Sequence, residues 1–147
     1  MPRESPPGSF PNVGLNYDYE YKKTLHLQTG RYDIEVRYDD YERSVYLQFA
    51  RDGQISPRSN RSHQEISQGR HDLLIVMREI TNALHHILGI KPVHSIQFHG
   101  AATEGGRIEL YQHFAQSLAA RYHGEAKWFP TGSYVHFIIR IGAAYDD

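Results

Sequence analysis

The residue types best suited to chemistry gather between His99 and Arg107. His99 stands near the end of a stretch typical of a strand, and Glu104 follows five positions later. An imidazole titrates near neutral pH and can exchange a proton with a substrate, and a neighbouring carboxylate can orient it. We therefore take His99 and Glu104 as the candidate catalytic residues, with His136 as a second imidazole that the fold could bring beside them.

Anion binding is a second chemistry that the same segment supports. Thr103, Gly105, Gly106 and Arg107 stand where a predicted strand passes into a predicted helix. Glycines at a helix start present free N–H groups at the positive end of its dipole, and an arginine adds a two-pronged donor for phosphate. The alternative is ordinary capping, with Thr103 as the N-cap and Glu104 facing the dipole. Neither a P-loop nor a G-x-G-x-x-G sequence is present.

A third candidate is an arginine-bearing loop after residue 51. Arg58 and Arg61 lie among serines and asparagine there, with Arg51 and Arg70 on either side. Such a loop suits phosphate groups or an acidic protein partner, and the alternative is a solvated loop without a ligand. The formal net charge of −1 does not favour nucleic acid as the partner.

Metal and cofactor sites are not predicted. The chain has 10 histidines but no H-E-x-x-H or H-x-x-x-H spacing, and it has no cysteine. Thiolate metal sites and disulfides are therefore excluded, and no cofactor motif is found.

The elements that must position these residues follow from hydrophobic periodicity. Alternating residues predict strands over 15–27, 32–38 and 45–49, and continuous β-prone residues predict strands over 93–102, 126–129 and 134–141. Helical spacing predicts helices from about 62 to 88 and from 107 to 122. The fold class is therefore α+β, with one mixed, mostly antiparallel sheet in the order β-β-β-α-β-α-β-β. Both amphipathic helices are expected to pack on one face of this sheet.

Local sequence signals place the boundaries. Residues 1–14 are predicted to form a flexible N-terminal arm, residues 15–142 a single domain, and residues 143–147 a short acidic tail. Ser62 and Glu65 match a capping box at the start of the first helix, and Gly89 with Pro92 is expected to end it. A turn is predicted at residues 130–132.

The 11 tyrosines form a pattern of their own. Tyr17, Tyr19 and Tyr21 share one face of the first strand, where they are expected to pack under the helices, whereas Tyr46 falls on the other face. An aromatic sheet face suits stacked bases or a protein interface. An exposed tyrosine-rich edge strand would need covering, which predicts a twofold homodimer.

The element order resembles that of ribonuclease H over nearly the whole chain. That resemblance implies carboxylates that hold two metal ions, one of them at the end of the fourth strand. This chain has His99-Gly100-Ala101-Ala102 there. No catalytic residue is therefore transferred from that family.

The sequence is most consistent with a small cytoplasmic binding or regulatory module that engages a protein partner or an anionic, phosphate-bearing ligand. It shows no signal peptide and no uninterrupted apolar run long enough for a membrane span, so no membrane partner is expected. The alternative is a small hydrolase or transferase acting on a phosphate-containing or nucleic-acid substrate. In that enzyme His99 would be the acid/base, Glu104 its orienting group and Arg107 the charge stabiliser.

Overall fold

The structure is a computed structural model that describes residues 17–51, 63–101 and 105–142. Within these ranges the side chains of 17, 18, 63–67, 101 and 105–107 lie outside the description. The elements are β1 (Tyr17–Leu27), β2 (Gly30–Asp39), β3 (Ser44–Arg51), α1 (His63–Ile90), β4 (Ser95–Ala101), α2 (Gly105–Arg121), β5 (Glu125–Thr131) and β6 (Tyr134–Arg140). The predicted element order and fold class are confirmed.

One six-stranded sheet, in the order β1-β2-β3-β4-β6-β5, contains every described strand. The first three strands form the predicted antiparallel meander, and β4, β6 and β5 form a second antiparallel group. The two groups join through a parallel pairing of β3 with β4 that covers three residue pairs, from Ser44–Ser95 to Tyr46–Gln97. The long helix α1 makes the crossover that a parallel pairing requires.

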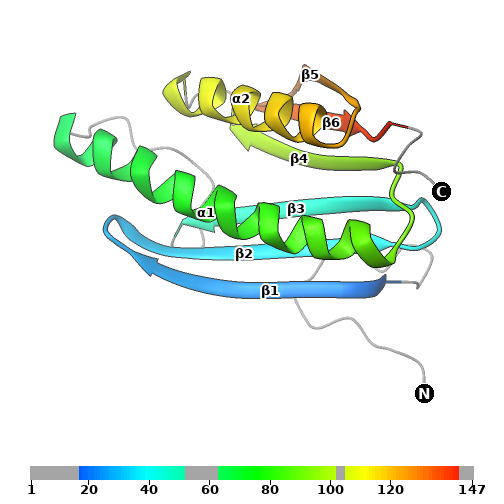
Figure 1. Ribbon diagram of the computed structural model, residues 1–147. Coiled ribbons are helices and arrows are strands. Elements are labelled where there is room, and N and C mark those ends of the chain that lie inside the picture. Colours follow the sequence, from blue (N-terminus) through cyan, green and yellow to red (C-terminus); the bar gives the residue numbers. More distant parts are fainter. Residues whose placement is uncertain (1–16, 52–62, 102–104, 143–147) are drawn as a thin grey trace.

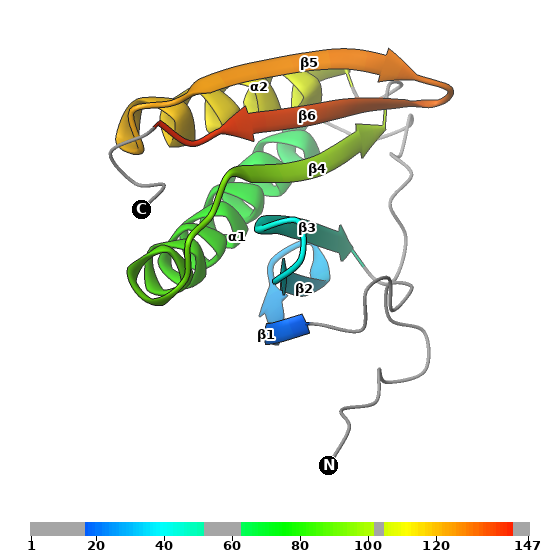
Figure 2. The ribbon, with the colours of Figure 1, turned by 90° about the vertical axis from the view of Figure 1, so that its right-hand side faces the viewer.

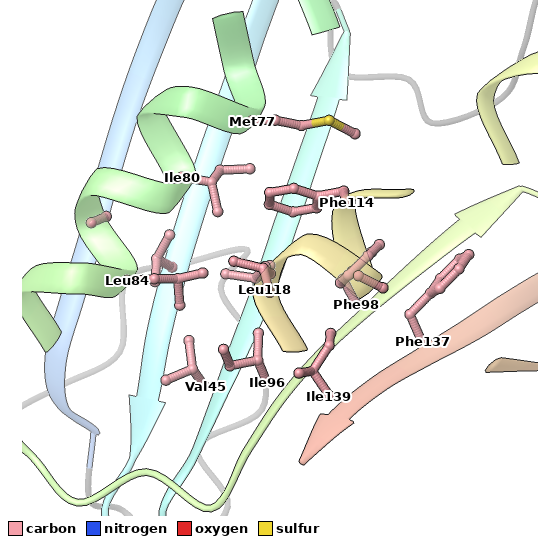
Figure 3. Packing of buried hydrophobic residues seen from close by; sticks show 14 of the residues in the cluster. Val45, Met77, Ile80, Leu84, Ile96, Phe98, Phe114, Leu118, Phe137 and Ile139 are labelled. Atoms are coloured by element: carbon pink, nitrogen blue, oxygen red, sulfur yellow. The ribbon is translucent and has the colours of Figure 1, made fainter. Parts of the chain in front are cut away.

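Both helices lie on the same face of the sheet (Figures 1 and 2). Helix α1 packs on β1 and β2, and α2 packs on β4, β5 and β6. Inward side chains of alternate strand residues meet them in one core, where Leu84 of α1 and Leu118 of α2 converge above Val45 and Ile96 (Figure 3). Burial of this apolar area provides the main stabilising free energy of the fold.

Helix α1 follows the predicted apolar stripe but ends differently. Leu73, Met77, Ile80, Leu84 and Ile87 are all buried, as their helical spacing predicts. Gly89, expected beyond the helix as its C-terminal glycine, instead lies within it, because the helix continues to Ile90. The stop falls before Pro92, whose ring cannot continue a helix.

By length and mean hydropathy, residues Gln68–Ile90 of α1 could also cross a membrane. In the folded domain this segment instead places its apolar stripe on the sheet. Asp72 of the same segment is buried and accepts hydrogen bonds from the N–H and Oγ1 of Thr29, each at 2.7 Å. These bonds fasten the helix to the β1–β2 turn.

Gly100 explains how β4 and α2 approach so closely. A Cβ placed on Gly100 would lie 2.4 Å from Cδ2 of Tyr111, a buried residue of α2. The Tyr111 ring also meets Phe98 edge to face at a centroid distance of 6.2 Å. Glycine at this strand position therefore lets an aromatic side chain pack directly against the backbone.

The β5–β6 hairpin turns later than the sequence predicts. Pro130 and Thr131, expected in the turn, belong to β5 and pair with Val135 and Tyr134. The chain reverses at Gly132, whose φ of 61° is the left-handed conformation that glycine accepts most readily. Proline is tolerated in β5 because it is an edge strand.

The edges bear on the predicted homodimer. Strands β1 and β5 lie at the two ends of the sheet, and they carry Lys22 and Lys23 in β1 and Pro130 in β5. Lysine and proline are residues that discourage edge-to-edge pairing. The homodimer stays a prediction.

Candidate functional site

The helix-free face of the sheet differs between its two halves. Over β1 and β2 it carries charged pairs, among them the buried Arg37, whose guanidinium contacts Glu20 and lies 3.5 Å from Glu35. Over β4, β6 and β5 it carries rings together with charged side chains, such as Lys127 at 3.3 Å from Glu125. We call the four residues His99, Phe129, Tyr134 and His136 the aromatic patch.

The centre of the aromatic patch is a pair of imidazoles. His99 and His136 occupy directly paired positions of β4 and β6, so both point to the helix-free face. Nε2 of His99 lies 2.6 Å from Nδ1 of His136, and the two rings meet edge to face at a centroid distance of 4.3 Å. His99 and His136 therefore lie together, while Glu104, the third member of the predicted group, lies outside the described residues.

Gln97 fixes which nitrogens carry protons. Its Nε2, which can only donate, bonds to Oγ of Ser95 at 3.2 Å, so its Oε1 must accept from Nε2–H of His136 at 3.1 Å. Nδ1 of His136 is then unprotonated and accepts from Nε2–H of His99. The remaining nitrogen, Nδ1 of His99, is left as an acceptor.

The hydrogen-bonded chain continues from Gln97 through Ser95 to Ser44 of β3. Ser95 Oγ lies 2.8 Å from Ser44 Oγ, and Ser44 in turn donates to the backbone carbonyl of Glu42 at 3.3 Å. His99 donates from β4 to β6, His136 donates back to Gln97 of β4, and the chain then passes through Ser95 to β3 and ends at a backbone acceptor. Polarisation along such a chain strengthens its members.

The aromatic side chains complete the patch around the imidazoles. The ring centroid of Phe129 lies 5.4 Å from that of His136, and the centroid of Tyr134 lies 6.2 Å from that of His99. Phe129 is 45% exposed and Tyr134 is 38% exposed. Rings left open to solvent beside a polar array are typical of a binding surface.

Burial keeps both imidazoles neutral. Partial burial lowers the pKa of His99 below its ordinary value of 6.5, although one side of its ring is exposed. The pKa of His136 is lowered by burial and, secondarily, by the repulsion of a charged His99. At pH 7 the pair is therefore uncharged and His99 offers a lone pair.

The other predicted site residues are not placed. Thr103, Glu104, Arg58 and Arg61 lie outside the described residues, as do the 1–14 arm, the 143–147 tail and the Ser62 cap. Gly105 and Gly106 belong to the first turn of α2, which begins two residues before the predicted start at 107, while the side chain of Arg107 is outside the description. The anion site at residues 103–107 stays a prediction. The orienting role predicted for Glu104 stays a prediction, and the described residues that hold the His99 ring are His136 and, through it, Gln97.

Sequence reasoning missed a groove between α1 and α2, on the outer surface of the helix layer. It has a volume of about 630 Å³, with Leu74, Met77, Leu110, Phe114 and Leu118 among its apolar lining residues. Arg78, His113 and Arg121 are its cationic lining residues. The helical spacing of these apolar residues was the available signal, but it does not tell which faces of the two helices meet, which only the tertiary structure shows.

Within residues 17–51, 63–101 and 105–142, no group of three metal-ligand side chains converges. Comparisons with protein-family models, with characterised proteins and with solved structures find no match. The function is therefore argued from the site alone.

Proposed function

We propose that this protein is a small binding module that takes a nucleotide on the aromatic patch. The observation that supports this proposal most directly is the polarised chain that ends at His99, flanked by the exposed rings of Phe129 and Tyr134. A nucleobase combines the two complementary properties, a flat ring and N–H donors at its edge.

Stacking provides the first part of the recognition. Aromatic side chains on an open sheet face stack on bases in several nucleic-acid-binding modules, and each stacked base contributes about 1–3 kcal/mol. Phe129 lies on the edge strand β5 and Tyr134 at the start of β6, so their rings approach the imidazole pair from two strands. A base that covers this pair would shield apolar surface now exposed to water.

Hydrogen bonding provides the second part. Nδ1 of His99 has no partner among the described residues, and the order of donors leaves it as an acceptor. A base N–H would satisfy it without any change of tautomer in the array. A site built to accept such a bond discriminates against ligands that lack the donor.

The phosphate would lie toward the start of α2. Strand β4 ends at Ala101 and α2 begins at Gly105, so four Cα steps, at most about 15 Å, separate them. The positive end of a 17-residue helix attracts an anion there. The nearly balanced charge of the chain favours a single nucleotide over a long polynucleotide.

A hydrolase or transferase is the second candidate function, and one specific observation favours it. His99 is neutral, has an unpartnered nitrogen, and is oriented by His136, which is in turn held by Gln97. General-base catalysis requires a proton-accepting side chain that a second group holds in place, and the imidazole pair has this arrangement. Conversion of a bound nucleotide to product would establish the enzyme, whereas saturable binding without turnover would establish the module.

The test is a titration with adenosine or uridine 5′-monophosphate, in which the ring signals of the aromatic patch are monitored in NMR spectra. We expect saturable shifts at Phe129, Tyr134 and the two imidazoles. Ribose 5-phosphate, which lacks the base, is expected to bind at least about fivefold more weakly, because it loses the stacking free energy.

Two matched variants complete the design. Phe129→Ala should weaken nucleotide binding by about 1–3 kcal/mol. Tyr41→Ala removes another exposed ring, 79% exposed and outside the aromatic patch, and should leave binding unchanged. Equal losses for the two variants, or no shifts in the patch at millimolar nucleotide, would contradict the proposal.

A further inference from the structure

We infer that the groove between α1 and α2 is a second binding site, for a long-chain carboxylate. This site lies on the helix layer, opposite the aromatic patch, and it does not depend on the nucleotide proposal. The inference rests on the shape of the groove, its apolar floor and the charge of its rim.

The groove suits a narrow apolar chain. One wall is the Leu74–Thr81 segment of α1 and the other is the Leu110–Arg121 segment of α2. At 1.5 Å per residue the α2 wall is about 16 Å long and the α1 wall about 10 Å long. Met77 and Phe114 project between the two helices and form part of its floor (Figure 3).

The apolar lining is only partly covered by the protein itself. Leu74 is 53% exposed, and Leu110 is half-buried. An alkyl chain lying on these side chains would remove apolar surface from water, which is the dominant favourable term in such binding.

The rim selects a negative head group. Arg78, His113 and Arg121 are exposed, and none of the described lining residues is acidic. Within the described part of the chain, neither the Arg78 side chain nor the Arg121 side chain makes a hydrogen bond or ion pair. Two guanidinium groups at one groove can therefore donate to a carboxylate without first breaking another interaction.

Size favours a small ligand over a protein partner. A volume of about 630 Å³ lies within the range of small-molecule sites. The groove has 11 lining residues, whereas a stable protein–protein interface uses about 20–30 residues on each side. A single-chain amphiphile with an anionic head matches both the volume and the charge.

The test is a titration with sodium dodecanoate below its micelle concentration, monitored through leucine and methionine methyl signals in NMR spectra. Saturable shifts are expected at Leu74, Met77 and Leu110. Dodecan-1-ol, which has the same chain without the charge, is expected to bind at least about tenfold more weakly, because charge-assisted hydrogen bonds are lost.

Charge reversal separates this site from non-specific adsorption. R78E/R121E should weaken dodecanoate binding at least about tenfold. R140E reverses an exposed charge on the other face and should leave binding unchanged. Leu74→Gln should also weaken dodecanoate binding, and because position 74 is exposed we expect this variant to fold.

Several outcomes would overturn the inference. Equal affinity for dodecanoate and dodecan-1-ol would remove the role of the arginines, and so would an unchanged affinity in R78E/R121E. Binding to phosphatidylglycerol vesicles without binding to monomeric dodecanoate would assign the groove to a membrane surface. Displacement of dodecanoate by an acidic amphipathic peptide at lower concentration would assign it to a protein.

Discussion

His99 and His136 share one hydrogen bond across directly paired positions of β4 and β6, with 2.6 Å between their nitrogens and an angle of 66° between their ring planes. Neutral imidazoles can share such a bond only if one donates and the other accepts. Gln97 determines which imidazole donates, because its Nε2 donates to Ser95 and its Oε1 is therefore the acceptor for His136. The pair is therefore a polarised unit with its acceptor at the outer end.

The pair should make stability depend on pH. Both pKa values are lowered in the folded protein from the ordinary 6.5, so below pH 6.5 the unfolded chain binds more protons than the folded chain. Stability is then fully present above pH 6.5 and is lost as the pH falls toward the folded pKa values. Urea unfolding across this range should show the decrease, and it should be smaller in H99Q/H136Q. His85→Gln, at an exposed helix position, should retain the full decrease.

The tautomer of His136 should respond to Gln97. Gln97→Glu replaces the accepting amide by a carboxylate, which favours the charged imidazole and should raise the pKa of His136. Nitrogen NMR should detect protonated Nε2 and bare Nδ1 in the parent protein at pH 7. Gln48→Glu, on the same face but in β3, serves as the control. A parent His136 protonated on Nδ1 would reverse the assigned direction of the chain.

Gly100 should tolerate no side chain. Gly100→Ala places a Cβ 2.4 Å from the ring of Tyr111 and should destabilise the fold by about 1–3 kcal/mol. Gly89→Ala is the matched control, because nothing lies within 4 Å of the added Cβ and the residue is helical. That change should stabilise by up to about 1 kcal/mol. Thermal unfolding of the two variants should therefore shift in opposite directions.

Asp72 should stabilise the junction between α1 and the β1–β2 turn. Asp72→Ala leaves the N–H of Thr29 without its acceptor in a partly buried site, which should cost about 1–3 kcal/mol of unfolding free energy. Asp40→Ala removes an exposed carboxylate and should change stability by less than about 0.5 kcal/mol. An equal loss of unfolding free energy in the two variants, measured by urea unfolding, would show that the bonds from Thr29 to Asp72 add no stability.

Local periodicity was sufficient to predict the elements of this fold. The alternation around Ile34 and Val36 and the helical spacing from Leu73 to Ile87 both report which side chains are buried. The end of α1 was misplaced because Gly89 keeps helical geometry, and the residue that prevents further extension is Pro92. Pro130 was predicted in the turn because proline is typical of turns, but it lies in β5, where an edge strand accommodates it.

The candidate site was less accessible from sequence. His99 was singled out by its place near a strand end, but its partner is set by the register between β4 and β6, which no local pattern encodes. Gln97 and Phe129 attracted no attention because neither residue type signals chemistry in isolation. The groove between α1 and α2 depends on how two helices lie relative to each other.

The most direct measurement for the proposed function is an intermolecular NOE experiment on the protein with adenosine 5′-monophosphate. Binding on the aromatic patch predicts NOEs from the adenine protons to the rings of Phe129 and Tyr134, with a simultaneous shift of Nδ1 of His99. A nucleotide that binds but gives NOEs only to residues of the helix layer would contradict the proposal.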